Sequence, residues 1–290
     1  MNVGLIGVGL MGHGIARNVL SRGGHALGFL DHPGNQPTDE ILSLGGRPVA
    51  SPAGIAEEAD VILLCVTGAP QVEAVMEGLL PALRPGTVVV DCSTSLPETT
   101  LRMGARTAEA GCAFLDAPMT RTASHAHAGT LNLLVGGEAA TLERVRPVLD
   151  SFTETVTHVG PLGHGHRLKL LHNYVSVGFM TLLAEAAAQS ADAGIDPAVL
   201  VDVLAQGGGA SAALDRLSPF ILKGDRSGLP FAVANAAKDI DYYREMSEAA
   251  GAQRTIADGV SAAIRGVAGE AGAQAYVPEL VRLFRKGGGV

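Results

Sequence analysis

The sequence predicts an α/β fold: a doubly wound, mostly parallel sheet in the N-terminal half, with helices making up the rest. The first observation is alternation, because short β-branched runs alternate with segments whose apolar residues recur at helical spacing. Right-handed helical crossovers between such runs give parallel strands covered by helices on both faces. The expected strands are residues 2–6, 26–30, 61–66, 87–91, 113–116, 131–135 and 155–159, and the expected helices are residues 12–20, 71–79, 98–110 and 139–149.

The second observation is a change in composition after Gly160. Strand-like runs disappear, and Ala, Leu, Glu and Gln dominate residues 168–193. That stretch is long enough for about seven helical turns at 3.6 residues each. Pro and Gly then punctuate a series of further helical segments. We therefore expect an α/β domain over residues 1–162 and an all-helical domain over residues 163–290.

Composition and charge exclude several classes of function. The net charge of −8 argues against a nucleic-acid partner, because binding to a phosphate backbone needs a basic surface. The apolar runs are too short to cross a bilayer, and the N-terminus lacks the basic segment of a signal peptide. The histidines do not cluster with acidic or cysteine partners in the sequence, so no metal site is predicted. A reduced, cytoplasmic protein is indicated by the three cysteines, which lack metal-ligand spacing: Cys65, Cys92 and Cys112.

The segment from Gly7 to Gly12 (GVGLMG) connects the first expected strand to the first expected helix. Gly7 permits a tight turn, Gly9 lets the backbone approach a pyrophosphate, and Gly12 allows close packing of helix on strand. The N–H groups and the dipole at a helix N-terminus favour phosphate. A lone glycine pattern also occurs in ordinary strand–helix turns, but here the strand, the helix and an acid at the proper distance agree. This turn, with Leu10 and Met11, is expected to bind a dinucleotide.

The acid is Asp31, which closes the second expected strand. A carboxylate there accepts hydrogen bonds from the adenosine ribose hydroxyls and repels a 2′-phosphate. The residues that follow, from His32 to Gly34, supply no arginine to bind such a phosphate. NAD is therefore favoured over NADP, and the alternative is that Asp31 only stabilises a turn.

Four separated motifs follow one another through nearly the whole chain. They are GVGLMG at residues 7–12; DAPMTRT at residues 116–122, continuing to GTL at 129–131 and GG at 136–137; GHGHRLK at residues 163–169, continuing to Asn173; and Phe231 followed by KDI at residues 238–240. In these motifs the sequence resembles the β-hydroxyacid dehydrogenases, the family of 3-hydroxyisobutyrate dehydrogenase. It resembles the sulfolactaldehyde reductase branch of that family in two features, Arg-Thr at the positions of Arg121 and Thr122 and a serine at that of Ser176, but has His172 instead of asparagine.

The resemblance implies a Rossmann domain, a long interdomain helix, an all-helical second domain and an active site in the cleft between the domains. It identifies Lys169 as the catalytic lysine and Asn173 as the asparagine beside it. It places Thr120, Arg121 and Thr122 in the loop that binds the substrate carboxylate, which is usually Ser-Gly-Gly. The resemblance and the strand ends further imply cofactor contacts at Val66, Thr94 and Lys238.

Dehydrogenation of an alcohol by NAD requires a base for the hydroxyl proton, and the reverse reaction requires an acid. A lysine can serve when burial and nearby cations lower its pKa. On a helix, Lys169, His172, Asn173 and Ser176 share an arc of roughly 100°. Such a polar stripe needs a wet cleft or mutual hydrogen bonds. A surface role is the alternative for Lys169, and His172, where the family commonly has asparagine, either contacts substrate, carries a proton or fills space.

Arg121 stands where the family usually has glycine. Its guanidinium suits a carboxylate, sulfonate or phosphonate, which indicates a substrate with an extra anionic group or an acid bound by arginine instead of backbone amides. The alternative is that Arg121 pairs with a nearby Asp or Glu.

The sequence thus predicts an oxidoreductase that moves a hydride between NAD(H) and a small, anionic 3-hydroxy acid or its semialdehyde. Imine reductases share the implied architecture but generally replace the lysine. A NAD-binding sensor without catalysis would need neither Lys169 nor Asn173. The resemblance also implies a homodimer or homotetramer, and no nucleic-acid or membrane partner is expected.

Overall fold

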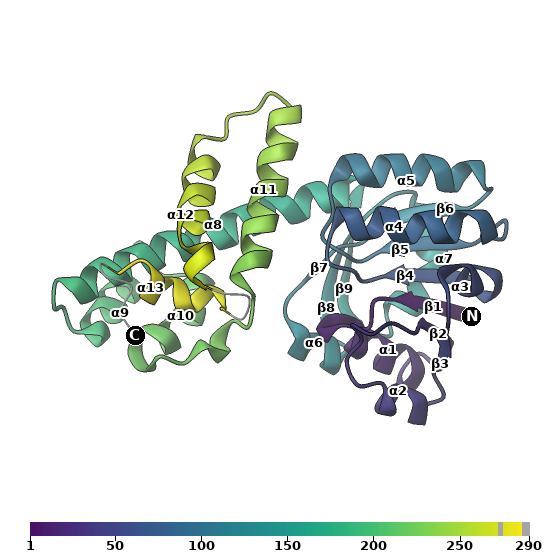
Figure 1. The fold of residues 1–290 in the computed structure, drawn as a ribbon, viewed down its shortest axis with the longest axis horizontal. Helices are drawn as coiled ribbons and strands as arrows, with labels where there is room; N and C mark the ends of the chain where they lie inside the picture. The colour runs from purple at the N-terminus through teal and green to yellow at the C-terminus, as the bar shows by residue number, and fades with distance from the viewer. Residues whose placement is uncertain (272–274, 286–290) are drawn as a thin grey trace. The chain divides into compact units, whose positions relative to one another are not determined.

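The computed structural model describes residues 1–271 and 275–285 (Figure 1). Its contacts divide the chain into two compact units, an N-terminal unit of Met1–Lys169 and a C-terminal unit of Leu170–Val290. The division falls after Lys169, whereas the sequence placed it after residue 162. The first turn of the long helix α8 (His164–Asp192) belongs to the N-terminal unit because its buried His166 is bonded to the sheet of that unit.

One sheet organises the N-terminal unit. Within the described residues its strands follow the order β3-β2-β1-β4-β5-β6-β8-β7, with β9 beside β8. The strands from β3 to β6 are parallel, and β8 is antiparallel to β6 and β7. The strand order reverses between β1 and β4, which is the switch point where doubly wound sheets bind ligands. The strands are β1 Asn2–Ile6, β2 Ala26–Leu30, β3 Arg47–Val49, β4 Val61–Leu64, β5 Val88–Asp91, β6 Ala113–Asp116, β7 Met119–Thr120, β8 Leu131–Gly136 and β9 Thr153–Gly160.

Helices cover both faces of this sheet. Successive side chains of a strand point to opposite faces, so Leu5 and Ile6 of β1 belong to two different cores. The core of Leu5 includes Ile15 of α1, and the core of Ile6 includes Met76 of α4. Figure 1 shows α4 and α5 on one side of the strands and α1 and α2 on the other. The helices are α1 Leu10–Ser21, α2 Asp39–Ser43, α3 Pro52–Glu58, α4 Ala69–Leu79, α5 Pro97–Glu109, α6 Ala123–Ala128 and α7 Ala139–Leu149.

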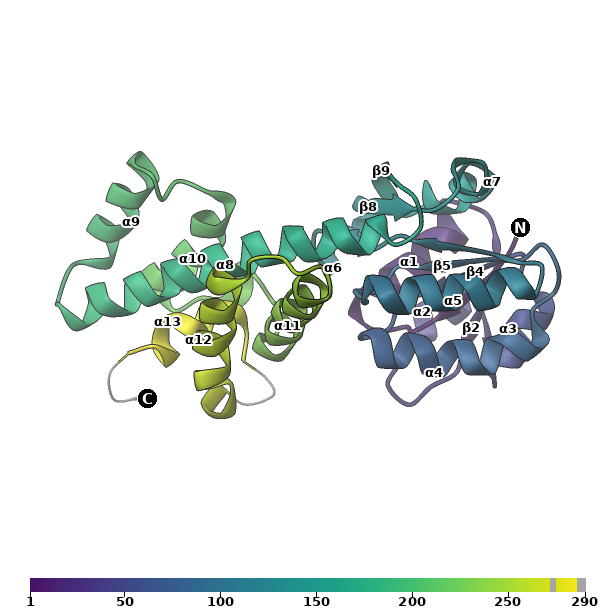
Figure 2. The same cartoon turned by 90° about the horizontal axis from the view of Figure 1, so that it is seen from above.

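The described part of the C-terminal unit is helical. After α8 come α9 Pro197–Gln206, α10 Ala212–Lys223, α11 Val233–Ala249, α12 Thr255–Ala271 and α13 Leu280–Leu283. Met180 of α8, Leu217 of α10 and Ile240 of α11 are fully buried in its core. Helices α11 and α12 lie side by side in Figures 1 and 2, and an ion pair joins Arg244 to Asp258. None of the described helices is long and apolar enough to span a membrane.

The predicted fold class is confirmed: the chain combines a Rossmann-type sheet, a long helix and a helical second part. Each expected strand and helix has a counterpart, with ends that differ by a few residues. The long helix begins at His164 and ends at Asp192, against an expected 168–193. The sequence analysis missed five short elements: β3, β7, α2, α3 and α6.

Candidate active site

The glycine-rich turn between β1 and α1 has the geometry of a dinucleotide turn. Gly7 has φ +101°, where L-residues are strained, and a Cβ there would overlap the carbonyl oxygen of Cys65. A Cβ at Gly12 would overlap the carbonyl oxygen of Gly7, so the helix lies against the turn. At Gly9, by contrast, no described atom comes within 4 Å of a Cβ. The space above Gly9 therefore fits a pyrophosphate that approaches the backbone closely.

The other expected cofactor residues follow the carboxyl ends of neighbouring parallel strands. Val66 comes after β4, where its N–H donates to Ser93 Oγ at 3.0 Å, and Thr94 comes after β5. Asp31 follows β2, is exposed, and its N–H donates to the carbonyl of Val49 at 2.9 Å. In the turn itself, Leu10 is exposed and Met11 is half-buried. All of these residues belong to one unit, at the sheet edge where ligands of doubly wound folds bind.

A buried polar cluster lies directly behind this edge, and the sequence analysis did not find it. His166 is completely buried; its Nε2 donates to the Ser93 carbonyl at 3.1 Å, and its Nδ1 is hydrogen-bonded to the Thr100 hydroxyl at 2.7 Å. Asp116 accepts the backbone N–H groups of Gly163 at 2.8 Å and of His166 at 2.7 Å. These bonds fix the first turn of α8, and with it the backbone around Lys169, to the ends of β5 and β6.

Asp91 completes the buried cluster. One oxygen accepts the N–H of Ser93 at 2.9 Å, and the other, 3.9 Å from His166 Nε2, has no hydrogen-bond partner among the described residues. Burial raises the pKa of the Asp91 carboxyl, although His166 and Ser93 act in the opposite direction. Burial, followed by the charge of Asp91, also raises the pKa of Cys65 to about 12, so this thiol stays protonated.

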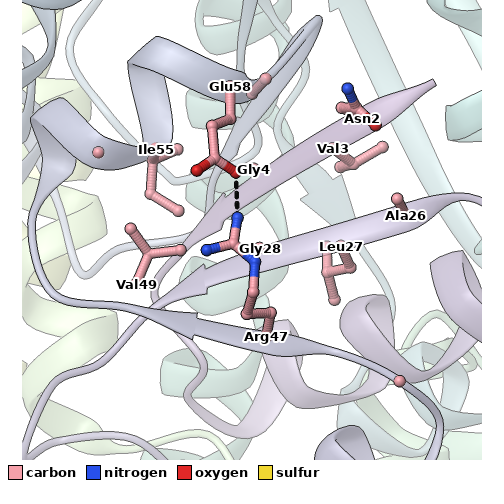
Figure 3. Close-up of a pocket in the computed structure, with 13 residues that line it drawn as sticks. Asn2, Val3, Gly4, Ala26, Leu27, Gly28, Arg47, Val49, Ile55 and Glu58 are labelled. Carbon is pink, nitrogen blue, oxygen red and sulfur yellow. Dashed lines mark hydrogen bonds and ion pairs between the residues drawn. The ribbon is translucent and has the colours of Figure 1, made fainter.

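A cavity of about 330 Å³ opens at the other end of the sheet (Figure 3). Its walls include Asn2 and Ala26, which begin β1 and β2, and an ion pair joins Arg47 to Glu58 across it. Ligands of doubly wound sheets bind at the carboxyl ends of the strands, not the amino ends. This cavity is therefore separate from the expected dinucleotide site.

The loop from Thr120 to Thr122 joins β7 to α6. Arg121 has φ 77°, in the left-handed region that favours glycine, the residue expected at this position from the family resemblance. The Arg121 side chain pairs with Glu154 and donates to the Thr130 carbonyl at 2.7 Å. This pairing lowers the pKa of Glu154. Of the two interpretations of Arg121, the structure thus displays the intramolecular ion pair, which a substrate anion would have to displace.

The side chain of Thr122 bonds within its own segment. Its hydroxyl lies 2.8 Å from Ser124 Oγ and 2.9 Å from His125 Nδ1. Thr120, the last residue of β7, is half-buried. The loop therefore combines two hydroxyls and a guanidinium, which together can donate hydrogen bonds to an anionic oxygen.

Four polar residues of α8 lie on one face of the helix, as the spacing predicts. Lys169, half-buried, is the last residue of the N-terminal unit, and Asn173 follows one turn later in the C-terminal unit. Asn173 Nδ2 donates to Asp239 at 2.6 Å, while His172 Nδ1 donates to Asn173 Oδ1 at 3.0 Å. Ser176, one turn beyond His172, is half-buried.

Lys238 extends this network on α11. Its Nζ lies 3.0 Å from Asp239 Oδ1 and 5.0 Å from the centre of the Tyr242 ring. The chain His172–Asn173–Asp239–Lys238 thus fixes the amide of Asn173 in one orientation. The sequence left His172 as a substrate contact, a proton carrier or a space-filling residue, and in the structure its Nδ1 contacts the neighbouring amide of Asn173.

Two family models match most of the chain. Residues 2–160 match the NAD binding domain of 6-phosphogluconate dehydrogenase. Residues 163–284 match the model described as NAD-binding of NADP-dependent 3-hydroxyisobutyrate dehydrogenase. The two matches meet at residues 160 and 163, close to the domain boundary expected from the sequence.

Similar sequences are dehydrogenases and reductases of small hydroxy acids. The 2-(hydroxymethyl)glutarate dehydrogenase of Eubacterium barkeri is 32% identical over 244 residues, which cover 83% of this chain and 80% of that protein. The 3-sulfolactaldehyde reductase of Escherichia coli is 34% identical over 188 residues, 64% of this chain and 62% of that protein.

Solved structures with a similar fold include a dehydrogenase and an imine reductase. The Mycobacterium tuberculosis 3-hydroxyisobutyrate dehydrogenase with L-serine superposes with a TM-score of 0.88 at 25% identity and covers 98% of this chain and 99% of its own. An imine reductase of Streptomyces aurantiacus, which covers 99% of this chain and 100% of its own, has a TM-score of 0.62 at 20% identity. The second likeness shows a shared fold alone.

Proposed function

The chain belongs to the β-hydroxyacid dehydrogenases, a family of NAD(P)-dependent oxidoreductases, and we propose that it interconverts a small 3-hydroxy acid and its semialdehyde with Lys169 as acid–base. The observation that carries the proposal is the pair on α8: a lysine followed one turn later by an asparagine whose amide is held by Asp239. A merely structural helix face has no need of a buried, pre-oriented amide beside a lysine.

The residues of the glycine-rich turn fit the dinucleotide. The open space at Gly9 and the close contact at Gly12 leave room for a pyrophosphate at the N-terminus of α1. The pyrophosphate side of the proposed site also includes Gly7, Leu10, Met11 and Val66. The nicotinamide portion is proposed to contact Thr94 and Lys238. A nicotinamide held there would supply the hydride acceptor for alcohol oxidation and the hydride donor for aldehyde reduction.

Asp31 supports NAD as the cofactor. Its exposed carboxylate can accept hydrogen bonds from ribose hydroxyls and would repel a 2′-phosphate. A comparison of kcat/KM with NADH and NADPH tests this preference, and a higher value with NADPH would contradict it.

In the direction of oxidation, Lys169 Nζ takes the proton of the substrate hydroxyl; in reduction it returns a proton to the carbonyl oxygen. Asn173 positions the reacting oxygen beside the lysine. Its amide can do so because Asp239 and His172 hold both of its ends. His172 therefore acts as a positioning residue.

Replacement of Lys169 by alanine tests the proposal. We expect kcat to fall by a factor of about 10²–10⁴, the usual contribution of a general acid–base, while NADH binding stays within a few-fold of the wild type. The exposed Lys223 at the end of α10 provides the control, since Lys223→Ala removes the same group elsewhere. Stopped-flow turnover and fluorescence titration with NADH separate the two effects. Near-normal turnover of the Lys169→Ala variant would remove this lysine from the mechanism.

The substrate is proposed to carry a second anionic group, bound by Arg121 with Thr120, Thr122 and Ser176. In the structure Arg121 is paired with Glu154, and that pair competes with a substrate anion. The Glu154→Gln variant should therefore lower KM for sulfonated and dicarboxylic substrates, and Arg121→Ala should raise it.

A panel of sulfonated, dicarboxylic and simple hydroxy acids measures this difference. If both variants keep wild-type kcat/KM for every acid, Arg121 stabilises the loop and does not bind the substrate. The same panel, extended to cyclic imines, separates the dehydrogenase from an imine reductase, and turnover of any acid excludes a sensor without catalysis. The presence of Lys169 favours the dehydrogenase.

Two properties of the whole protein are part of the proposal. We infer that the enzyme is a homodimer or homotetramer, because α9 presents exposed aliphatic side chains in the C-terminal unit. We also place it in the cytoplasm, where its thiols Cys65, Cys92 and Cys112, all free, would stay reduced.

A further inference from the structure

Two histidines and a glutamate meet on the N-terminal unit, and the first of them, His13, directly follows the glycine-rich turn. His13 lies on α1, Glu40 on α2 and His127 on α6, and one potential ligand atom from each lies within 4.8 Å of the others. His13 Nε2 is 3.9 Å from Glu40 Oε2, and the two imidazole centres are 5.2 Å apart. Two imidazoles and one carboxylate are a ligand set typical of zinc sites with an open fourth position.

The backbone holds the two histidines in place. Helices α1 and α6 pack so closely that a Cβ at Gly14 would lie 2.5 Å from the carbonyl carbon of Ala126. Asn18 Nδ2 donates to the carbonyls of Ala126 at 2.9 Å and His127 at 3.1 Å. Arg17 Nη1 donates to the His127 carbonyl as well, at 3.1 Å. Both imidazoles thus project from elements that are fixed to each other before any ligand binds.

The hydrogen bonding of these side chains indicates that they bind a ligand. His13 is only 8% exposed, and its Nδ1 has no hydrogen-bond partner among the described residues. A buried imidazole nitrogen without a hydrogen-bond partner is unfavourable. Glu40 Oε1 accepts from Arg17 Nε at 2.8 Å, which turns Oε2 towards His13. Glu40 and His127 are exposed, so their side chains can close on an ion.

We propose that His13, Glu40 and His127 bind a divalent transition-metal ion, with Zn²⁺ the best match to this ligand set. Zinc ligands at about 2.0–2.2 Å stand roughly 3.4 Å apart in a tetrahedron, so the three ligand atoms need to draw together by about 1.5 Å or less. Water takes the fourth position. The bound ion ties α2 and α6 to α1, the helix that follows the glycine-rich turn.

Titration of the metal-free enzyme with Co²⁺, followed by its visible absorption, tests the site. We expect one equivalent to bind with a tetrahedral spectrum, and added Zn²⁺ to displace it. His127→Ala and Glu40→Gln, both at exposed positions, should each weaken binding by at least tenfold. His158→Ala removes an exposed histidine from β9 and should bind Co²⁺ like the wild type.

A thermal melt gives a second readout. The unfolding midpoint of the wild type should rise with Zn²⁺, and that of His127→Ala should not, because only a native-state site stabilises by binding. Equal Co²⁺ affinity in the wild type and His127→Ala, or no tetrahedral spectrum in the wild type, would overturn the proposal.

Discussion

A methyl group added at Gly9 meets open space, whereas one added at Gly12 meets the carbonyl of Gly7. Gly9 also has φ −78°, which alanine adopts without strain. Gly9→Ala should therefore fold with an unfolding midpoint near that of the wild type, yet bind NADH at least tenfold more weakly. Gly12→Ala should lose about 1–3 kcal/mol of stability because helix and turn must separate.

Thermal melts and NADH titrations of the two variants distinguish these effects. Tight NADH binding by Gly9→Ala would mean that no pyrophosphate approaches this turn.

Single residues differ in how far the sequence predicts their environment. The three glycines of the turn could be assigned roles because each role depends on local backbone geometry. The sequence did not decide between anion binding and an internal ion pair for Arg121, since its partner Glu154 lies far along the chain, on β9. The same holds for His13, Glu40 and His127, which come from three separate helices and show no spacing pattern. Contacts over long sequence separations follow from packing, and one sequence does not reveal them.

Among the secondary-structure elements, length decided what the sequence could predict. Long helices and buried central strands carry several periods of the apolar pattern. The five missed elements are short, and β3 contains Pro48, which normally argues against a strand. Proline is tolerated there because β3 is an edge strand, which among the described residues pairs only with β2. Helix α6 has only six residues, ends at Gly129 with φ 68°, and is held mainly by α1.

The first turn of α8 carries a prediction of its own. His166→Ala removes two hydrogen bonds and leaves the carboxyls of Asp91 and Asp116 buried without the imidazole. A buried polar group left without its hydrogen-bond partner costs about 1–3 kcal/mol, so His166→Ala should lower stability by at least that amount. His164, on the same turn, is exposed, so His164→Ala should change stability by no more than about 0.5 kcal/mol.

Urea unfolding of both variants provides the comparison. If the two midpoints coincide, the buried cluster does not secure the helix that carries Lys169. Turnover adds a readout: a positioning role predicts that His166→Ala lowers kcat more than it raises KM, provided that the variant is assayed well below its unfolding midpoint.

For the whole molecule, each unit has its own apolar core. The N-terminal unit contains the dinucleotide turn, and the C-terminal unit contains Asn173, Asp239 and Lys238. Helix α8 carries Lys169 and Asn173 on either side of the division. The sequence could place these two residues one turn apart because helical spacing alone determines that.

The surface of α9 leads to a prediction about assembly. None of its side chains, all within the described part of the chain, is buried. Leu200 and Leu204 pack partly against the core of the C-terminal unit, whereas Val199 and Val203, one turn apart on the helix, are 53% and 65% exposed. An aliphatic face of this kind is typical of an interface between subunits. Val203→Glu should therefore shift the protein towards smaller species, because a carboxylate is costly to bury.

Ala205→Glu adds the same charge at an exposed position on the other side of the helix, about 200° along the helical turn from Val203, and should leave assembly unchanged. Light scattering coupled to size exclusion measures the mass of each variant. A wild-type mass equal to one chain, or a Val203→Glu mass equal to that of the wild-type oligomer, would contradict an interface on α9. In the second case the subunits would have to associate through other surfaces, and the aliphatic face of α9 would need a different partner.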